Sequence, residues 1–228
     1  ATRSTEALLN GFQCSRDDII AASPYKLPRL IQEDHFHRQG AMLVEYLFEP
    51  DELVNIVTES TYDQTSDRWK PANRGTTLIR AEWTEKLLDP LPPTQGGAWI
   101  RMNAVDGNGI SKANLTSFRY SLLEFDDKLD RHLQLSVFAR LSLPIIAIID
   151  SGRRGHHAWI AMDAASLDDY DKEYRDMFDA CRIYGMDSNV SPTTMSRLPG
   201  VIRNGRKQEL IYLNPDAANG DWMKGILQ

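Results

Sequence analysis

Four apolar runs mark the second half of the chain as strand-forming. They cover residues 116–126, 144–149, 157–162 and 208–213, and a further run at residues 98–103 precedes them. β-Branched and aromatic residues favour strands, and a continuous apolar run is expected of a strand buried on both faces. The pattern therefore predicts a sheet whose central strand is residues 144–149.

Two helical patterns lie between these runs. Residues 130–141 repeat apolar positions at helical spacing. Residues 166–184 begin with Ser166 ahead of acidic residues and end before Gly185, which are start and stop signals of a helix. The order β-β-α-β-β-α-β predicts an α+β or α/β fold, one sheet with helices packed on it. Its β-α-β-β-α-β part is the order of a ferredoxin-like or RNA-recognition-motif-like sheet.

The N-terminal segment predicts short helices rather than strands. Residues 5–13 and 15–22 have helical patterns, and Ser15 is a suitable N-cap for the second of them. Prolines then interrupt the pattern. We therefore expect a helical extension over residues 1–35, followed by the main domain over residues 36–228.

The segment between this extension and the strand-rich half is less regular. Acidic residues around Pro50 resemble the first turn of a helix, which would run from residue 49 to about residue 60. Residues 62–76 are polar and are expected to be rich in loops. The proline- and glycine-rich residues 89–97 form the clearest break in the chain.

Composition limits the classes of protein to which the chain can belong. Its 228 residues suffice for one core, or for one domain with an appendage, and its net charge is −6. A protein that coats DNA through a broad positive surface is usually basic overall, so any nucleic-acid site here is expected to be local. Basic residues do gather in the C-terminal third, at Arg153, Arg154, Arg197, Arg203, Arg206 and Lys207.

The residues given predict neither a membrane helix nor a signal peptide. No apolar run approaches the roughly 20 residues that a membrane helix needs, and the N-terminus lacks the regions of a signal peptide. The chain starts without Met, which is typical of a processed form or of a piece of a longer polypeptide. We expect a cytoplasmic protein with no membrane partner, in which Cys14 and Cys181 are reduced thiols and not zinc ligands.

The first candidate site is a pair of acids at the end of the run 116–126. Glu124 and Asp126 are two positions apart, so on a strand they would project side by side, with Phe125 in the core behind them. Two carboxylates held close together repel each other, and a divalent cation relieves that repulsion. Hard oxygen ligands suit Mg²⁺ or Mn²⁺. The alternative to a metal site is a strand end at which both acids turn towards solvent.

The second candidate is a basic, glycine-rich loop between the predicted strands 144–149 and 157–162. Its polar and basic residues are Ser151, Arg153, Arg154, His156 and His157. The glycines let the backbone fold tightly and expose its N–H groups, and the arginines add bidentate donors for phosphate oxygens. The alternative is a basic hairpin turn with solvated arginines.

The third candidate follows the second predicted helix. Asp187 comes shortly after Gly185, and Arg197 lies in the run Ser196-Arg197-Leu198-Pro199-Gly200. Asp187 is either a turn-capping residue or a third carboxylate, and Arg197 is either a surface residue or a phosphate ligand. Three carboxylates with an Arg/His phosphate loop suit two-metal phosphoryl transfer.

Together these groups resemble the motifs of the archaeo-eukaryotic primase superfamily, the primase–polymerases. Leu122-Leu123-Glu124-Phe125-Asp126 is similar to the first motif, apolar-apolar-acid-apolar-acid. The run from Ser151 to Trp159 resembles the long form of the second motif, Ser-Gly-Arg-Arg-Gly-x-His-x-Trp, with the family histidine at His157. Asp187 ahead of Arg-Leu-Pro-Gly resembles the third motif of the branch found in phages, plasmids and integrated elements. The resemblance covers about residues 97–214.

The resemblance implies template-directed synthesis of RNA or DNA from NTP or dNTP on single-stranded DNA, in the replication of a phage or another mobile element. It implies two Mg²⁺ or Mn²⁺ ions, held by Glu124, Asp126 and Asp187. It assigns the incoming nucleotide to Ser151, Arg153, Arg154, His157 and Arg197. It also implies a second α/β module beside the RNA-recognition-motif-like sheet, and a replicative helicase fused to the domain or associated with it.

Two other functions fit the same residues. A non-catalytic replication or defence module would keep the fold for binding nucleic acid alone. A metal-dependent nuclease would use the same carboxylates, but it gives the basic loop no obvious role. Incorporation of nucleotides on a template separates the three hypotheses.

Overall fold

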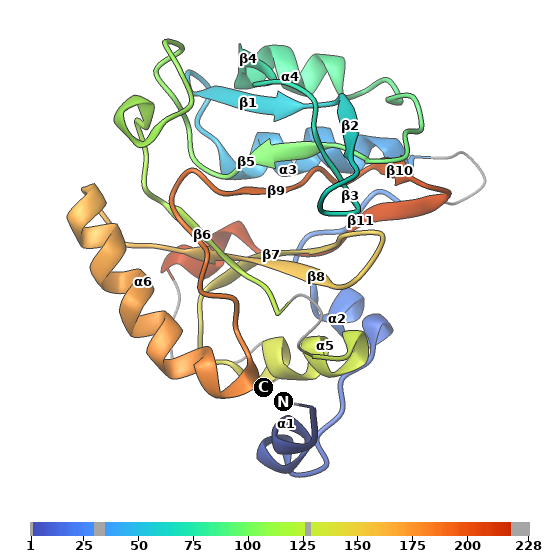
Figure 1. Cartoon of the computed structure of the whole chain (residues 1–228), viewed down its shortest axis with the longest axis vertical. Helices are drawn as coiled ribbons and strands as arrows, with labels where there is room; N and C mark the ends of the chain where they lie inside the picture. The colour runs from blue at the N-terminus through green and yellow to red at the C-terminus, as the bar shows by residue number, and fades with distance from the viewer. Residues whose placement is uncertain (1, 30–34, 126–128, 220–228) are drawn as a thin grey trace. The chain divides into compact units, whose positions relative to one another are not determined.

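The structure is a computed structural model that describes residues 2–29, 35–125 and 129–219. Over these ranges the chain is a mixed α+β protein with antiparallel sheets (Figure 1), as the sequence predicts. It divides into two compact units. Unit 1 consists of Ala1–Lys26, Phe118–Pro192 and Ile211–Gln228, and unit 2 consists of Leu27–Ser117 and Thr193–Leu210.

Unit 1 is built on strands whose order differs from their order in the chain. β8 (His156–Ala161) pairs antiparallel with both β6 (Tyr120–Leu123) and β7 (Ile145–Asp150). β6 and β7 therefore run in the same direction, connected through α5 (Arg131–Arg140), with β8 between them. This is a split β-α-β arrangement. β11 (Arg206–Leu213), whose C-terminal end belongs to unit 1, lies next to β7.

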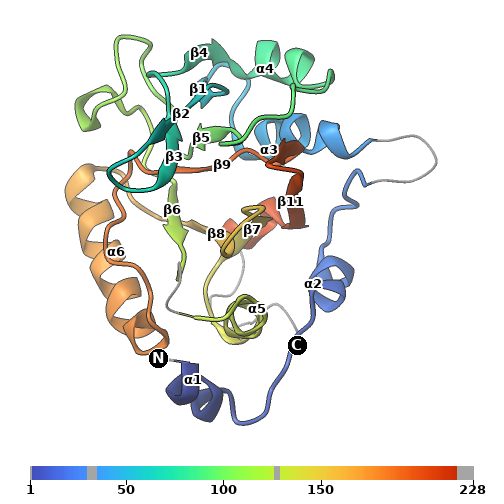
Figure 2. The same cartoon turned by 45° about the vertical axis from the view of Figure 1, so that its right-hand side comes forward.

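Helices cover one face of this sheet. Besides α5 they are α1 (Thr2–Leu9), α2 (Arg16–Ala22), α6 (Leu167–Cys181) and the 3₁₀ helix η4 (Arg182–Tyr184), and a further 3₁₀ helix, η5 (Pro215–Asn219), contacts β7. α1 and α2 both contact α5 (Figure 2). The buried residues of these helices form one core with Leu123, Ala158 and Ile160 of the sheet. Since side chains alternate along a strand, Leu122 and Trp159 lie on the opposite face.

Local signals at the helix ends are those that the sequence predicts. The Ser15 side chain accepts a hydrogen bond from Asp18 N, and the Asp18 carboxylate accepts one from Ser15 N, which makes a capping box. The Ser166 hydroxyl likewise accepts from Asp169 N at 3.2 Å. Gly185, with φ +87°, follows η4 in the left-handed conformation that glycine tolerates.

Unit 2 contains a sheet in the order β4-β1-β5-β9, a two-stranded ribbon β2-β3 and two α-helices. Its strands are β1 (Leu53–Val57), β2 (Ser60–Asp63), β3 (Arg68–Pro71), β4 (Thr76–Ile79), β5 (Trp99–Arg101), β9 (Met195–Arg197) and β10 (Val201–Arg203). Its helices are η1 (Phe36–Arg38), α3 (Gln39–Leu47), α4 (Arg80–Lys86) and η2 (Lys112–Asn114). β10 pairs antiparallel with the part of β11 that belongs to unit 2.

One prediction for this unit is wrong, and a second is only partly right. The helix expected over residues 49–60 is a turn followed by β1 and the start of β2. The Glu52 carboxylate accepts from Glu49 N at 2.7 Å, so the acids close a turn instead of capping a helix. The apolar residues that follow pair with β4 and β5. Residues 62–76, expected to be loop-rich, contain most of the β2-β3 ribbon.

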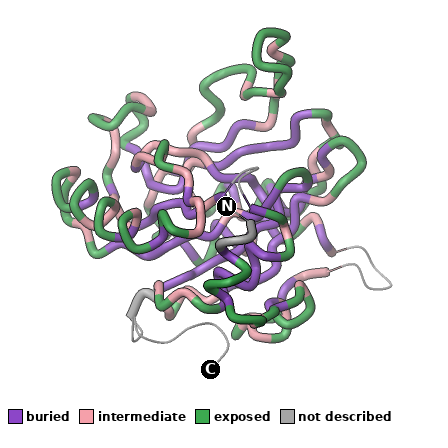
Figure 3. Tube along the Cα trace, turned by 60° about the horizontal axis from the view of Figure 1, so that its bottom comes forward, coloured by how far each residue is buried: buried purple, intermediate pink, exposed green. Residues whose placement is uncertain are grey.

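The strand predicted to be central is among the buried parts of the chain, which Figure 3 shows in purple. All six residues of β7 are buried, and β7 has a strand on each side, so it is the central strand that its apolar run predicts. Cys14 and Cys181 are buried free thiols, and burial raises the pKa of each to about 11. In the parts of the chain that the structure describes, every helix is too short or too polar to cross a membrane.

Candidate functional site

Glu124 and His157 face each other across neighbouring strands of unit 1. β6 ends at Leu123, which pairs with Ala158, so the next pair in the same register is Glu124 with His157. Glu124 Oε2 lies 3.2 Å from His157 Nε2, and the two side chains keep 19% and 14% of their exposure. The first and second motifs therefore meet on the sheet face opposite the helices. Phe125 is fully buried in the core, as predicted, and it packs against Phe138.

Asp187 is held against the same strand end. Its backbone N–H donates to the Glu124 carbonyl oxygen at 3.0 Å, and its own carbonyl oxygen accepts from the Tyr174 hydroxyl at 3.1 Å. Asp187 Oδ1 accepts from Asn189 N at 3.0 Å, so this carboxylate also caps a turn. The fold thus brings the third motif to the first, although α5, β7, β8, α6 and η4 separate them in the chain.

Tyr174, on α6, was not singled out from the sequence. Burial, followed by the negative charges of Asp187 and Glu124, raises the pKa of its hydroxyl to about 12. The hydroxyl is therefore protonated at neutral pH and acts as a hydrogen-bond donor. Tyr174 also stacks between Tyr170 and Phe178. A tyrosine at helical spacing reads as a core residue, so the sequence gives no signal for its contact with Asp187.

Asp126, the second predicted carboxylate, lies outside the described residues. Glu124 and Asp187 are the members of the predicted triad that the structure describes. Among residues 2–29, 35–125 and 129–219, no three His, Cys, Asp or Glu side chains are grouped as metal ligands.

The basic loop, residues 151–155, joins β7 to β8 as the sequence predicts. Ser151 is buried and its backbone N–H donates to the Gly155 carbonyl oxygen at 3.0 Å, which closes the loop. Gly152 adopts φ +71°, a conformation that side-chain-bearing residues rarely take. Arg153 and Arg154 are exposed. The loop therefore has a fixed backbone that carries two exposed cationic side chains.

Asp150, the last residue of β7, anchors this loop. Its carboxylate accepts from Arg16 Nη1 at 2.5 Å, from Arg131 Nη2 at 2.6 Å and from Gly152 N at 2.8 Å. Burial alone would raise its pKa. Nearby His156, the Gly152 N–H and the two arginines outweigh burial and hold the pKa below its ordinary value. An acid at the end of an apolar strand can be recognised in the sequence. The residues that bind it cannot be recognised there.

His156 and His157 have different surroundings. The His156 side chain is buried, its backbone N–H donates to Gln134 Oε1 at 2.8 Å, and its ring lies 4.0 Å from Asp150. Burial first, and then the nearby arginines, lower its pKa to about 4 despite the attraction of Asp150. It is therefore neutral at pH 7. His157, the predicted site residue, is the more exposed of the two, and its role in the site stays a prediction.

Arg197 belongs to unit 2, whereas the other candidate residues that the structure describes belong to unit 1. It is buried, its Nη1 donates to the Gly96 carbonyl oxygen at 2.6 Å, and its guanidinium lies 4.2 Å from the centre of the Trp99 ring. These contacts give Arg197 a packing role within unit 2. Its predicted contact with phosphate stays a prediction.

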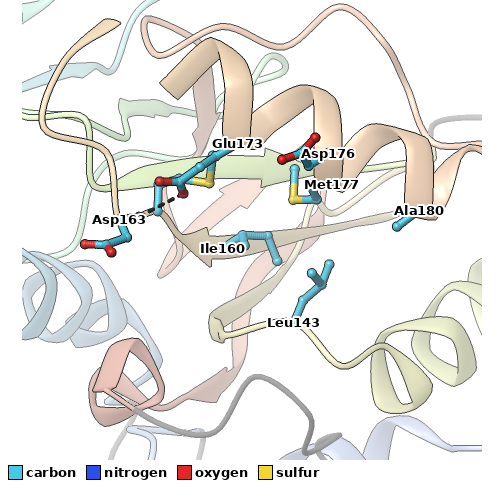
Figure 4. A pocket seen from close by; sticks show the side chains of 8 residues that line it. Leu143, Ile160, Asp163, Glu173, Asp176, Met177 and Ala180 are labelled. Atoms are coloured by element: carbon cyan, nitrogen blue, oxygen red, sulfur yellow. Dashed lines mark hydrogen bonds between the residues drawn. The ribbon is translucent and has the colours of Figure 1, made fainter. Parts of the chain in front are cut away.

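A separate cavity of about 400 Å³ lies in unit 1 between α6 and the ends of β7 and β8 (Figure 4). Ile160, Met162 and Met177 give it an apolar wall, and acids lie at its rim. One of these acids, Glu173, accepts a hydrogen bond from Asp163 N at 2.9 Å. Ile160 and Met177 belong to the helix-covered core. None of the candidate site residues lines the cavity.

Comparisons with known proteins found no matching family model, no matching curated protein and no matching solved structure. The resemblance to the primase–polymerases therefore rests on the three sequence motifs alone.

Proposed function

We propose that this chain is a primase–polymerase catalytic domain of the archaeo-eukaryotic primase superfamily, of the type found in phages, plasmids and other mobile elements. It would extend a nucleic-acid strand from NTP or dNTP on a single-stranded DNA template. One observation carries the proposal: Glu124 of the first motif lies 3.2 Å from His157 of the second, while its carbonyl oxygen binds the backbone of Asp187 from the third. A solvated strand end does not require these three motifs to meet.

The connectivity of unit 1 supports an RNA-recognition-motif-like sheet. β6, α5, β7 and β8 form the split β-α-β part of such a sheet, and α6 follows in the expected place. The final strand, β11, lies next to β7, whereas a ferredoxin-like sheet carries its last strand beside the first. The proposed likeness is therefore strongest around the three motifs. Unit 2 would be the second module.

The donor chemistry of the site fits a hard divalent cation. Glu124 and Asp187 supply carboxylate oxygens, which Mg²⁺ and Mn²⁺ prefer, and we assign Asp126 to the same ligand set. A divalent ion bound here would activate the attacking hydroxyl and neutralise charge on the leaving oxygens. His157, through its contact with Glu124, would hold that carboxylate in one orientation.

The basic loop would bind the triphosphate of the incoming nucleotide. Arg153 and Arg154 offer guanidinium donors, which pair with phosphate oxygens through two hydrogen bonds. Ser151 and the loop N–H groups add short-range donors, and His157 lies where the loop ends. In the reaction, the 3′-hydroxyl of the growing strand gives its proton to water and its oxygen bonds to the α-phosphorus. The bond from the α-phosphorus to the oxygen bridging to the β-phosphate breaks, and pyrophosphate leaves. The chain's residues act by positioning these groups and by balancing their charge.

Synthesis on a template tests the proposal. The protein is incubated with single-stranded DNA, Mg²⁺ or Mn²⁺, and labelled NTP or dNTP, with and without a primer. We expect metal-dependent incorporation that Asp126→Ala abolishes. Template binding without any synthesis would favour a non-catalytic replication or defence module. Metal-dependent cutting of DNA in the absence of nucleotides would favour a nuclease.

A further inference from the structure

The N-terminal helix α2 reaches the basic loop through a buried carboxylate. Asp150 keeps 8% of its side-chain exposure, and its Oδ2 is shared by Arg16 of α2 and Arg131 of α5. A buried carboxylate is costly unless donors compensate it, and here two cations and a backbone N–H do so.

The same group of residues fixes the loop backbone at successive positions. Asp150 Oδ1 accepts from Gly152 N at 2.8 Å, and Arg131 Nη1 donates to the Arg153 carbonyl oxygen at 2.8 Å. These bonds hold the peptide units that carry the two exposed arginines. A change in Asp150 or in its partners would therefore be transmitted directly to Arg153 and Arg154.

α2 is anchored independently of this ion pair. Ile19 is fully buried in the core, and the backbone N–H of Cys14 donates to Ser136 Oγ of α5 at 3.0 Å. A capping box at Ser15 fixes the first turn, where Arg16 is the first helical residue. Arg16 thus reaches Asp150 from a helix whose position does not depend on Arg16.

Charge gives Arg16 a second effect on the loop. A carboxylate next to a phosphate-binding loop repels phosphate, and the repulsion falls when cations compensate the carboxylate. Arg16 and Arg131 each lie within 2.6 Å of Asp150. Loss of Arg16 would leave more of the negative charge of Asp150 facing a bound triphosphate.

We infer that Asp150 is a positioning residue of the triphosphate site and that α2 is part of this site through Arg16. The inference rests on the proposed function, because it concerns the same loop. It gives the predicted N-terminal extension a role beyond that of an appendage: the extension sets both the conformation and the local charge of the basic loop.

The test compares Arg16→Met, which keeps the aliphatic stem, with Arg16→Lys, which keeps the charge. The matched control is Arg182→Met, since Arg182 makes an exposed ion pair with Asp179 in the same unit. Affinity is measured by fluorescence anisotropy with labelled ATP and dATP in the presence of Mn²⁺. Cleavage after Arg153 and Arg154 by trypsin reports on the loop without nucleotide, and thermal unfolding reports on stability.

We expect Arg16→Met to weaken triphosphate binding roughly tenfold, as loss of a supporting outer-shell partner does at other sites, and to speed cleavage in the loop. Arg16→Lys should recover most of the affinity, and Arg182→Met should bind as the wild type does. A folded Arg16→Met protein with wild-type affinity and wild-type cleavage would overturn the role of Arg16 alone. A wild-type protein that binds neither nucleotide would overturn the proposed function and this role with it.

Discussion

The two faces of the unit 1 sheet both carry polar side chains, which are buried on one face and partly exposed on the other. On the helix-covered face, His156 is buried, and it lies with Asp150 among protein donors and cations. On the other face, Glu124 and His157 contact each other and keep part of their exposure. Alternation along β8 therefore separates a histidine that supports the loop from one that we assign to chemistry.

The largest expected effect is on the chemistry face. Glu124→Gln removes a charge that the proposed reaction requires, so synthesis should fall by about 10²–10³-fold. The unfolding free energy should change by less than about 0.5 kcal/mol, because the side chain is partly exposed and keeps its size. Activity and urea unfolding are measured in parallel. Asp176→Asn, an exposed acid on α6, is the control and should leave both unchanged.

The next largest effect is a loss of folding stability at acid pH, which we expect from His156. Its pKa is about 4 in the folded protein and about 6.5 when unfolded, so the unfolded chain binds the proton more readily. The neutral, buried His156 therefore contributes to the free energy of unfolding. This contribution is fully present above pH 6.5 and is lost as the pH falls towards 4, by about 3 kcal/mol in all. Urea unfolding between pH 7 and pH 4 measures the loss. His156→Gln should flatten the profile in this window, and an unchanged profile would show that His156 is not the group responsible.

Asp150→Asn should cost about 2 kcal/mol. The substitution keeps the shape but leaves Arg16 and Arg131 without their anionic partner, and breaking a buried pair costs about 3–5 kcal/mol. The smaller figure reflects the partial exposure of both arginines, 34% and 39%, which lets water screen them. Denaturant unfolding at pH 7 checks this value. A variant as stable as the wild type would mean that the ion pairs of Asp150 do not support the loop.

The smallest effect is on stability at the chemistry face. His157→Ala should lower the unfolding free energy by no more than about 0.5–1 kcal/mol, because the imidazole is not packed in the core. His132→Ala, an exposed histidine on α5, is the matched control and should change it by less than about 0.5 kcal/mol. A loss of several kcal/mol at His157 would place it with His156 as a structural residue.

Strong local signals made unit 1 predictable from the sequence. The continuous apolar run of β7, the serine caps of α2 and α6, and the glycine after η4 each specify structure within a few residues. Unit 2 was harder because its strands are short and depend on distant partners. β1 is a strand since it pairs with β4 and β5, and this overrides the helix-like acids before it.

The candidate site was predictable where a motif lies within one segment. The basic loop is predicted from the glycines and arginines between two apolar runs, and the resemblance to the second motif selects His157 over His156. Contacts between distant segments were not predictable. Nothing in the sequence pairs Arg16 with Asp150 or Tyr174 with Asp187, because these pairs form only when helices pack on the sheet.

The most direct test sets the two neighbouring histidines against each other in one assay. His157→Ala and His156→Gln are compared with the wild type for metal-dependent nucleotide incorporation on single-stranded DNA, at neutral pH and at a temperature where all three are folded. We predict that His157→Ala loses synthesis by about 10²-fold, because Glu124 is no longer held in place, while His156→Gln keeps most of it. Full synthesis by a folded His157→Ala protein would contradict the assignment of this sheet face to nucleotidyl transfer.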